Sequence, residues 1–139
     1  MFTIPIEQIF TQSKIKDSFL EISSKSSGLD EVSYNEFKTD FSKNIQNIIE
    51  SIITGTFIPE PLKKIEINKP NSDEKRPIAL SSIKDKLIQK VLYMNLRDYF
   101  ETTFSDKSYA YRRDKSTLRA INRTSQFIQE KKYWILKTE

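Results

Sequence analysis

The stretch that decides the fold is residues 67–92, INKPNSDEKRPIALSSIKDKLIQKVL. At its start, the segment Leu62–Asn68 alternates apolar and polar side chains, with two isoleucines on one face. This period of two predicts a half-buried strand. The polar, proline-led segment Pro70–Lys75 predicts a turn, and Arg76–Leu80 predicts a second strand. The sequence therefore predicts an antiparallel hairpin that leads directly into a helix.

Two cations flank the predicted turn. If the strands pair across it, Lys69 and Arg76 lie nearly opposite each other. Cross-strand neighbours are roughly 4.5–5.5 Å apart at Cβ, so both side chains would reach one anion. Arginine offers a planar fork and lysine a mobile point charge, and this combination suits a polyphosphate. The alternative is a hairpin tip that is simply solvated.

A long helix is predicted after the hairpin. It begins at a capping pair formed by Ser82 and Asp85. Asp85 and Gln89 lie four residues apart on one side, where they are placed to bond the backbone of neighbouring segments. The apolar residues of this helix cover more than one face, which predicts a central buried helix: Ile83, Leu87, Ile88, Val91, Leu92, Leu96, Tyr99, Phe100 and Phe104.

The segment before the hairpin also predicts helices. A first helix is expected from Ile6 to about Ser23. Ser33 and Glu36 form a capping box, and the helix that follows is expected to end at Gly55. Its apolar stripe steps by three and four: Tyr34, Phe37, Phe41, Ile45, Ile48 and Ile52. The predicted fold class is therefore α+β, with three or four helices around a short antiparallel hairpin.

Composition limits the chemistry that the chain can perform. The 139 residues are enough for one domain with a core, and they include neither Cys nor His. Thiolate and imidazole chemistry are thereby excluded, which leaves carboxylates, cations and recruited metal. No segment approaches the roughly 18 apolar residues of a membrane span, and the first ten residues lack the basic head of a signal peptide. We expect a cytoplasmic protein.

Positive charge is concentrated in the second part of the chain. Residues 1–60 carry a net charge of −4 and residues 61–139 a net charge of +8. Aromatic residues stand among the cations of one segment, and such planes stack on bases while cations hold phosphates. A general excess of surface lysine is the alternative. The residues that we expect to bind RNA are Tyr109, Tyr111, Arg112, Arg113 and Lys115.

The order and spacing of several short motifs resemble the N-terminal fingers region of prokaryotic reverse transcriptases, a group that includes group II intron, retron and CRISPR-associated types. Upstream, Gly28-Leu29-Asp30 with Phe37 and Gly55-Thr56-Phe57 is similar to the extra N-terminal motif of the non-viral members. The remaining motifs are Lys69-Pro70, Arg76-Pro77-Ile78-Ala79-Leu80, Asp85-Lys86-Leu87-Ile88-Gln89 and the segment Phe104–Arg112, with Trp134–Thr138 similar to the strand that enters the palm. One departure is Arg113-Asp114-Lys115-Ser116, where many relatives have Pro-Gly-Arg-Ser.

The resemblance implies a domain organisation and a set of site residues. Residues 1–27 would be an N-terminal helical extension, residues 28–132 the fingers, and residues 133–139 the start of a truncated first palm strand of a right-hand polymerase. Lys69, Arg76 and Leu80 would bind the incoming nucleotide. Mg²⁺ would act only in an intact enzyme, where palm aspartates hold it. Glu139 stands at the place of the first of these aspartates and is a weak metal-ligand candidate.

The resemblance therefore implies part of an RNA-directed DNA polymerase, a nucleotidyltransferase. Its partners would be template and primer RNA, a deoxynucleoside triphosphate (dNTP) and the remaining palm and thumb polypeptide. Since the palm aspartates are missing, the chain is expected to be incomplete for catalysis. One alternative is a non-catalytic RNA-binding module or half of a split reverse transcriptase. A third possibility is a helical scaffold whose basic face binds an acidic protein.

Overall fold

The structure is a computed structural model that describes residues 4–137. The chain divides into two compact units, Met1–Leu96 and Arg97–Glu139, which we call the N-terminal and C-terminal units. In chain order the elements are α1 (Ile6–Ile9), α2 (Gln12–Glu21), α3 (Tyr34–Thr39), α4 (Phe41–Ile53), β1 (Lys63–Asn68), β2 (Lys75–Leu80), α5 (Ile83–Thr103) and α6 (Thr117–Gln129). The boundary between the units falls within α5. None of the helices within residues 4–137 combines the length and apolar character needed to cross a bilayer.

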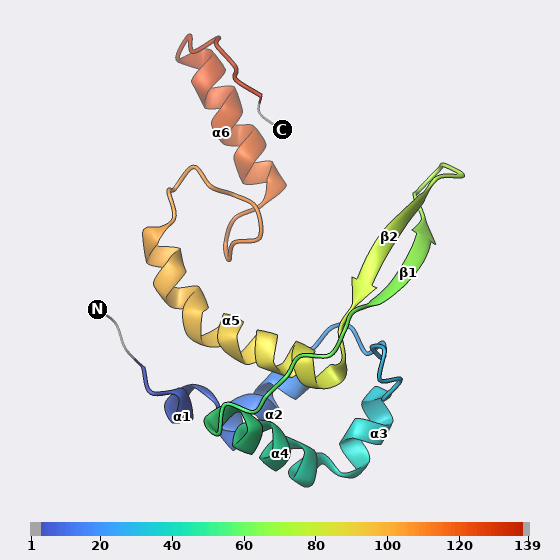
Figure 1. Ribbon diagram of the computed structural model, residues 1–139. Coiled ribbons are helices and arrows are strands. Elements are labelled where there is room, and N and C mark those ends of the chain that lie inside the picture. The colour runs from blue at the N-terminus through green and yellow to red at the C-terminus, as the bar shows by residue number, and fades with distance from the viewer. Residues whose placement is uncertain (1–3, 138–139) are drawn as a thin grey trace. The chain divides into compact units, whose positions relative to one another are not determined.

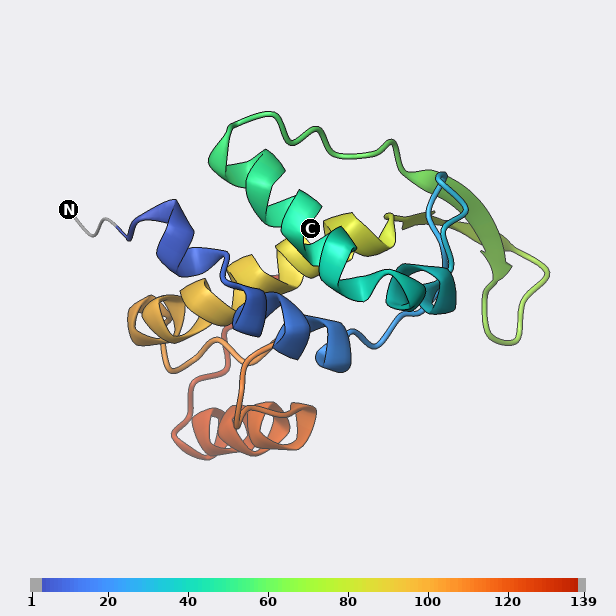
Figure 2. The same ribbon diagram turned by 90° about the horizontal axis from the view of Figure 1, so that it is seen from below.

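The N-terminal unit consists of helices packed against one another and the hairpin, which extends away from them (Figure 1). The α+β prediction is confirmed at this level. Helices α2, α4 and the first half of α5 lie together in both views (Figures 1 and 2) and enclose the core. The buried core residues of the described chain are Phe10, Ile15, Phe19, Phe37, Ile45, Ile48, Ile83, Leu87 and Val91.

An aromatic cluster joins α2 to α3 and α4. The ring of Phe19 stacks on Tyr34 at a centroid distance of 4.2 Å and lies 4.7 Å from Phe41 and 5.7 Å from Phe37. Three of the six residues of the predicted apolar stripe therefore surround one ring of the preceding helix. Such aromatic pairs contribute about 0.5–1.5 kcal/mol each beyond the area they bury.

Two helices that the sequence predicts as continuous are interrupted. The first breaks at Phe10, because Thr11 starts a new helix by accepting a hydrogen bond from the amide of Lys14 at 3.3 Å. The second breaks at Asp40. There the carbonyl of Phe37 accepts a hydrogen bond from the side-chain amide of Asn44 at 2.9 Å. In an unbroken helix that carbonyl would accept from the backbone amide four residues later.

The capping predictions are confirmed at three places. The Ser33 hydroxyl and the Glu36 carboxylate each bond the other's backbone amide. The hydroxyl of Ser82 donates to Asp85 Oδ2 at 2.7 Å and accepts from the Asp85 amide at 3.2 Å. Gly55 ends α4 in the left-handed region, at φ +70°, a conformation that glycine adopts without steric cost.

The prediction that α5 is buried on more than one face holds only for its first half, where Asp85 is buried in addition to the apolar edge. Its buried apolar residues are Ile83, Leu87 and Val91, which recur every four residues and so form a single line. Leu92, Tyr99 and other apolar residues of the same helix are 37–51% exposed. The periodicity correctly identified apolar positions, but the core of the N-terminal unit covers only one of the faces on which they lie.

The backbone of Gly28 lies close to the start of α5. A Cβ atom added at this glycine would lie 2.6 Å from the backbone nitrogen of Ser82 and 2.7 Å from its Cα. The neighbour is backbone and cannot rotate away, so no larger residue fits without a shift. The need for glycine in the Gly28-Leu29-Asp30 motif is thus a matter of packing against Ser82.

We therefore expect Gly28→Ala to destabilise the N-terminal unit by about 1–3 kcal/mol, the usual cost of forcing an atom into a filled site. Urea denaturation followed by circular dichroism would measure the change. Ser27→Ala is the matched control and should shift the free energy of unfolding by less than about 0.5 kcal/mol. Equal stability of the two variants would show that the approach of Gly28 to Ser82 is not a tight constraint.

Candidate functional site

The register of the hairpin differs from the prediction at Lys69 and Arg76, the two residues expected to bind phosphate. In the observed register Arg76 pairs with Ile67 and Lys75 with Asn68. The amide of Lys69 donates to the carbonyl of Glu74 at 2.8 Å, so a four-residue loop connects them. Lys69 is therefore opposite Glu74, and the prediction that it lies opposite Arg76 is wrong. The proline-led turn is two residues shorter than the sequence suggested, because Glu74 already pairs with Lys69 and Lys75 belongs to β2.

Lys69 and Arg76 nevertheless lie on the same face of the hairpin. Residues directly opposite in a sheet share a face, as do residues two apart along one strand. Arg76 is thus a diagonal neighbour of Lys69, at the roughly 7–8 Å typical of such pairs. Leu80 is on this face too, four residues beyond Arg76 and paired with Lys63. We call the face that carries Lys69, Arg76 and Leu80 the hairpin face.

The tip of the hairpin face is polar and exposed. Lys69 Nζ lies 2.6 Å from Glu74 Oε2, in an ion pair whose side chains are 47% and 71% exposed. Arg76 is exposed, and no acidic side chain within residues 4–137 forms an ion pair with it. Toward the base, Ile78 and Leu80 are partly buried. The hairpin face therefore combines one open guanidinium and one paired ammonium near its tip with a largely apolar base, where Lys63 lies opposite Leu80.

A buried carboxylate fixes the base of the hairpin. Asp85 is 6% exposed, and its Oδ2 accepts from the Ser82 hydroxyl and, at 3.1 Å, from the amide of Glu60. Glu60 precedes β1 and Ser82 follows β2, so one carboxylate connects the chain on both sides of the hairpin. Lys84 strengthens this junction through an ion pair with Glu60. Asp85 thus acts as a structural link, as its sequence position suggested, while Gln89 is exposed.

Lys86 ties the Gly28 loop to the same helix. Its Nζ donates to the backbone oxygen of Ser26 and, at 3.2 Å, to the Ser26 hydroxyl. Burial lowers the pKa of Lys86, and the nearby negative charge of Asp30 opposes part of that shift. Asp30 Oδ1 is itself buried without a hydrogen-bond partner. The sequence identifies Asp30 only as part of the Gly28-Leu29-Asp30 motif, and no local pattern indicates its electrostatic link to Lys86.

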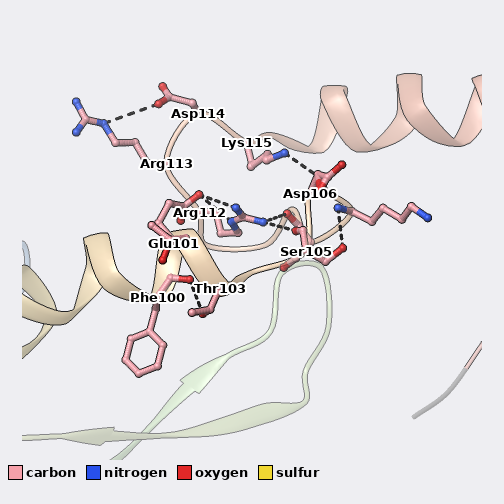
Figure 3. A network of polar contacts seen from close by, with 12 residues as sticks. Phe100, Glu101, Thr103, Ser105, Asp106, Arg112, Arg113, Asp114 and Lys115 are labelled. Atoms are coloured by element: carbon pink, nitrogen blue, oxygen red, sulfur yellow. Dashed lines mark hydrogen bonds and ion pairs between the residues drawn. The ribbon is translucent and has the colours of Figure 1, made fainter. Parts of the chain in front are cut away.

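Arg112 is held inside its own loop. Its Nε and Nη2 donate to Glu101 Oε1 at 3.0 and 2.7 Å, and its Nη1 donates to the carbonyls of Ser105 and Ser108 (Figure 3). The side chain is 8% exposed, and its guanidinium lies 5.2 Å from the centre of the Phe104 ring. The guanidinium is therefore already engaged with the protein. Its predicted contact with RNA stays a prediction, and the structure gives Arg112 a loop-fixing role.

Glu101 is the partner that the sequence did not reveal. The hydrogen bond from Arg112 lowers the pKa of Glu101 below its usual 4.5, against the opposing effect of burial, and the charges of Arg112, Lys115 and Arg97 add to the lowering. The two residues are eleven positions apart, on α5 and in the following loop. No periodic pattern connects such positions, so only the folded loop identifies the pair.

Of the other residues predicted to bind RNA, some have exposed side chains and some contact other groups of the protein. Tyr111 is fully exposed and has φ +56°, an uncommon conformation for a residue with a Cβ. Arg113 is 73% exposed, with only a loose 3.9 Å contact to Asp114. Lys115 donates to the carbonyl of Asp106 at 3.0 Å and lies 5.1 Å from the ring centre of Tyr109. The loop therefore presents Tyr111 and Arg113 outward.

The predicted palm strand, residues 133–139, is described only in part. Glu139 and Thr138 lie outside the described residues, while Tyr133–Lys137 belong to no helix or strand. Within residues 4–137 no group of three or more acidic side chains is placed to hold a metal ion. The described residues therefore do not fit a Mg²⁺ site. The expected palm strand and the metal role of Glu139 stay predictions.

Comparison with known proteins finds relatives encoded in introns. The chain is 34% identical over 79 residues to the group II intron-encoded protein LtrA of Lactococcus lactis subsp. cremoris, a match that takes in 57% of this chain and 13% of that protein. It is 31% identical over 91 residues to an uncharacterized 91 kDa protein in the cob intron of Schizosaccharomyces pombe, with 66% of the chain and 11% of the relative covered. Protein YkfC of Escherichia coli is 25% identical over 94 residues, which are 68% of the chain and 24% of YkfC.

No family model matches the chain. The matches support a relationship to intron-encoded proteins, of which the aligned part spans a small share. The retron and CRISPR-associated alternatives, and the assignment to the fingers, stay predictions.

We expect Arg112→Gln to loosen the loop that Arg112 holds. The change removes the charge-assisted hydrogen bonds to Glu101 and leaves two carbonyls without their donor. Protection of the Ser108 amide from hydrogen exchange should fall about tenfold or more, since one such bond is worth roughly 1.5–3 kcal/mol. Arg113→Gln, which removes the adjacent exposed guanidinium, is the control and should leave protection unchanged. Similar protection in both variants would contradict the loop-fixing role.

The same loop should weaken in acid. Because the pKa of Glu101 is lower in the folded state than in the unfolded chain, its stabilisation is complete above about pH 4.5. That stabilisation is lost as the pH falls through the lowered pKa. Protection factors for the Ser108 amide, corrected for the intrinsic exchange rate, should therefore decline as the pH falls below about 4.5, by at most the ratio of the two acid dissociation constants. In Glu101→Gln the decline should vanish, and a decline that persists would assign it to another carboxylate.

Proposed function

We propose that this chain is the fingers part of an intron-type reverse transcriptase. In this proposal the hairpin face receives the phosphates of an incoming dNTP, and the outward side chains of the loop before α6 contact RNA. The observation that carries the proposal is the shared face of Lys69, Arg76 and Leu80 on a hairpin anchored at its base by Asp85. The relationship to intron-encoded proteins adds support.

The geometry of the hairpin face suits a polyphosphate. A triphosphate carries several negative charges along its length. Two cations at diagonal spacing can therefore bind two different phosphate groups more easily than they can both bind the same phosphate group. Arg76 is open for a two-pronged contact, whereas Lys69 must exchange its partner Glu74 for a phosphate. An exposed ion pair is worth only about 0–1 kcal/mol, so this exchange is not a large obstacle.

Leu80 gives the hairpin face an apolar base beside the cations. It lies at the end of β2, where the chain turns into α5, and α5 is fixed there by the bonds of Ser82 and Asp85. We assign Leu80 to contact with the nucleotide and its template partner. Rigid support of this kind holds a binding residue in one position without a loss of entropy on binding.

RNA contact is assigned to the loop that precedes α6. Tyr111 offers an exposed ring for stacking, and Arg113 offers an exposed guanidinium for phosphate, with only a loose contact to Asp114. Lys115 and Tyr109 support each other nearby. Arg112 contributes by holding the loop that carries these residues, in addition to any RNA contact of its own. Template and primer RNA are thus the proposed partners of this surface.

Polymerisation itself would require more than the described residues. In a reverse transcriptase Mg²⁺ neutralises charge on the transferring phosphates, and carboxylates hold it. Since residues 4–137 contain no such carboxylate group, the catalytic metal would come with the palm of a remaining polypeptide. The second candidate, a non-catalytic RNA-binding module or half of a split enzyme, is favoured by the open Tyr111 and Arg113, which serve RNA binding without any chemistry.

RNA binding by the loop should depend steeply on salt. Each phosphate that is neutralised on a single strand contributes a slope of about 0.7 in a plot of log affinity against log salt. Removal of two cations in Arg113→Gln/Lys115→Gln should therefore flatten the slope by roughly 1.4. Titration of the chain with labelled single-stranded RNA between low and moderate salt measures it.

The control for this titration is Lys38→Gln/Lys43→Gln, which removes the same charge from the first part of the chain. Its slope should match that of the parent. An unchanged slope in Arg113→Gln/Lys115→Gln would place the RNA site elsewhere. Stronger binding to an acidic protein than to RNA would instead favour the scaffold function.

Nucleotide binding should depend on Arg76 and not on its neighbour Lys75, which lies on the other face of the hairpin. Arg76→Ala should weaken dNTP binding about tenfold to a hundredfold, since one charge-assisted contact is worth roughly 1.5–3 kcal/mol. Arg76→Lys should recover only part of this loss because the fork is absent. Chemical-shift changes of the hairpin amides during dNTP titration would measure the affinity.

Lys75→Ala is the matched control and should bind the nucleotide as the parent does. RNA affinity should remain nearly constant in all three variants. If Arg76→Ala lowered RNA affinity and left dNTP binding unchanged, the hairpin would be a template contact and the assignment of Lys69 and Arg76 would be wrong.

A further inference from the structure

Both outer edges of the hairpin are unpaired within residues 4–137, since its sheet has only the strands β1 and β2. In an antiparallel pair, residues that exchange backbone hydrogen bonds alternate with residues whose amides and carbonyls point outward. The bond from the Lys69 amide to the Glu74 carbonyl sets this alternation, because these two residues lie opposite each other. The outward positions are therefore Lys64, Glu66 and Asn68 on β1, and Lys75, Pro77 and Ala79 on β2.

Of the two edges, that of β1 has the complete set of backbone groups. Pro77 has no amide hydrogen, so the β2 edge lacks a donor at its centre. All three outward residues of β1 carry an amide hydrogen and are exposed. The hairpin extends away from the helices of its unit (Figure 1), which leaves the outer part of the β1 edge open. An edge of this kind is a template for pairing with another strand.

The charges on the outward positions of β1 have no opposite charge facing them within the hairpin. Lys64 lies opposite Ala79, and Glu66 lies opposite Pro77. Proteins often place a lysine on an edge strand, where its charge discourages the approach of a second strand. In β1 an acid stands two residues after the lysine, so a second strand with the same sequence offers each charge a partner.

A second copy of β1 matches this edge in one register. If two β1 strands run antiparallel about a two-fold axis at Ile65, Lys64 of each copy lies opposite Glu66 of the other copy. The two Ile65 side chains then meet on the half-buried face of the hairpin. A shift of two residues in either direction places Lys64 opposite Lys64, or Glu66 opposite Glu66, and like charges directly opposite each other are destabilising.

We propose that two copies of this chain associate through the β1 edge and form one four-stranded sheet in the order β2-β1-β1-β2. Two symmetric ion pairs between Lys64 and Glu66, together with the contact between the Ile65 side chains, set the register. A strand of six residues makes a small interface, so the association is weak and increases with protein concentration. The proposal uses neither the cations of the hairpin face nor the loop before α6, and it does not depend on polymerase function.

A single introduced cysteine tests the register, since the sequence contains no other thiol. In this register the two Ile65 residues form a pair without mutual hydrogen bonds. The Cα atoms of such a pair are about 4.5 Å apart, within the roughly 4.4–6.8 Å that a disulfide spans. Ile65→Cys should therefore form a disulfide-linked dimer when the folded 139-residue chain is incubated with oxidised glutathione.

The matched control is Ile67→Cys, which changes the next residue on the same face of β1. Its two copies would lie four residues out of register, a displacement of about 13 Å along the strand. A disulfide does not span that distance, so this variant should cross-link far more slowly than Ile65→Cys.

Charge reversal tests the ion pairs in a chain without cysteine. Lys64→Glu puts two acids opposite each other at two places and should raise the dissociation constant of the dimer roughly tenfold in sedimentation equilibrium. Glu66→Lys should have the same effect. The double variant Lys64→Glu/Glu66→Lys keeps the net charge of +4 and exchanges the members of each pair, so it should associate as the parent does. Lys38→Glu makes the same charge change on α3 and should leave the association unchanged.

The outcomes separate the possible occupants of the β1 edge. A chain that stays monomeric at every concentration, with no cross-linking of Ile65→Cys, would overturn the proposal and leave the edge to a strand of another polypeptide. Equal cross-linking of Ile65→Cys and Ile67→Cys would also overturn it, as would a double charge variant that associates no better than Lys64→Glu. Either result would place the contact between copies on another surface.

Discussion

The arrangement of the N-terminal unit depends on the buried carboxylate of Asp85. Its Oδ2 bonds Ser82, at the start of α5, and the amide of Glu60, in the segment that leads to β1. A hairpin of two strands is only marginally stable by itself, so it needs support from the rest of the protein. Asp85 supplies that support at both ends of the hairpin. Loss of this carboxylate would release the entry and the exit of the hairpin together.

Gly28 belongs to the same structural junction. The absence of a side chain lets its loop approach Ser82, and Lys86 then bonds Ser26 from the next turn of α5. The motif before the first capping box and the motif after the hairpin are thus parts of one packed junction, although more than fifty residues separate them. This proximity gives a physical reason for the two motifs to occur together in one chain.

Strands and helix caps, which depend on neighbouring residues, could be predicted from the sequence. Hydrogen-bond and ion-pair partners that are distant in the sequence could not. The alternation in β1 and the cap at Ser82 each depend on residues a few positions apart, and both are observed. The break at Asp40 depends on Asn44 competing for a carbonyl, and the burial of Arg112 depends on Glu101. The hairpin register differs from the prediction because the loop has four residues. Loop length sets the register, and the alternation of apolar residues does not determine it.

A cation is available to a ligand only where the fold leaves it exposed. Arg112 and Arg113 are neighbours with the same charge, yet one is buried against Glu101 and the other is exposed. The net charge of +8 in residues 61–139 therefore overstates the charge available to a phosphate strand. On the hairpin face, Lys69 is paired and Arg76 is open, so the guanidinium is the first group that an approaching anion meets. Binding there would begin at Arg76 and draw Lys69 away from Glu74, because a multiply charged phosphate attracts the ammonium more strongly than a single carboxylate does.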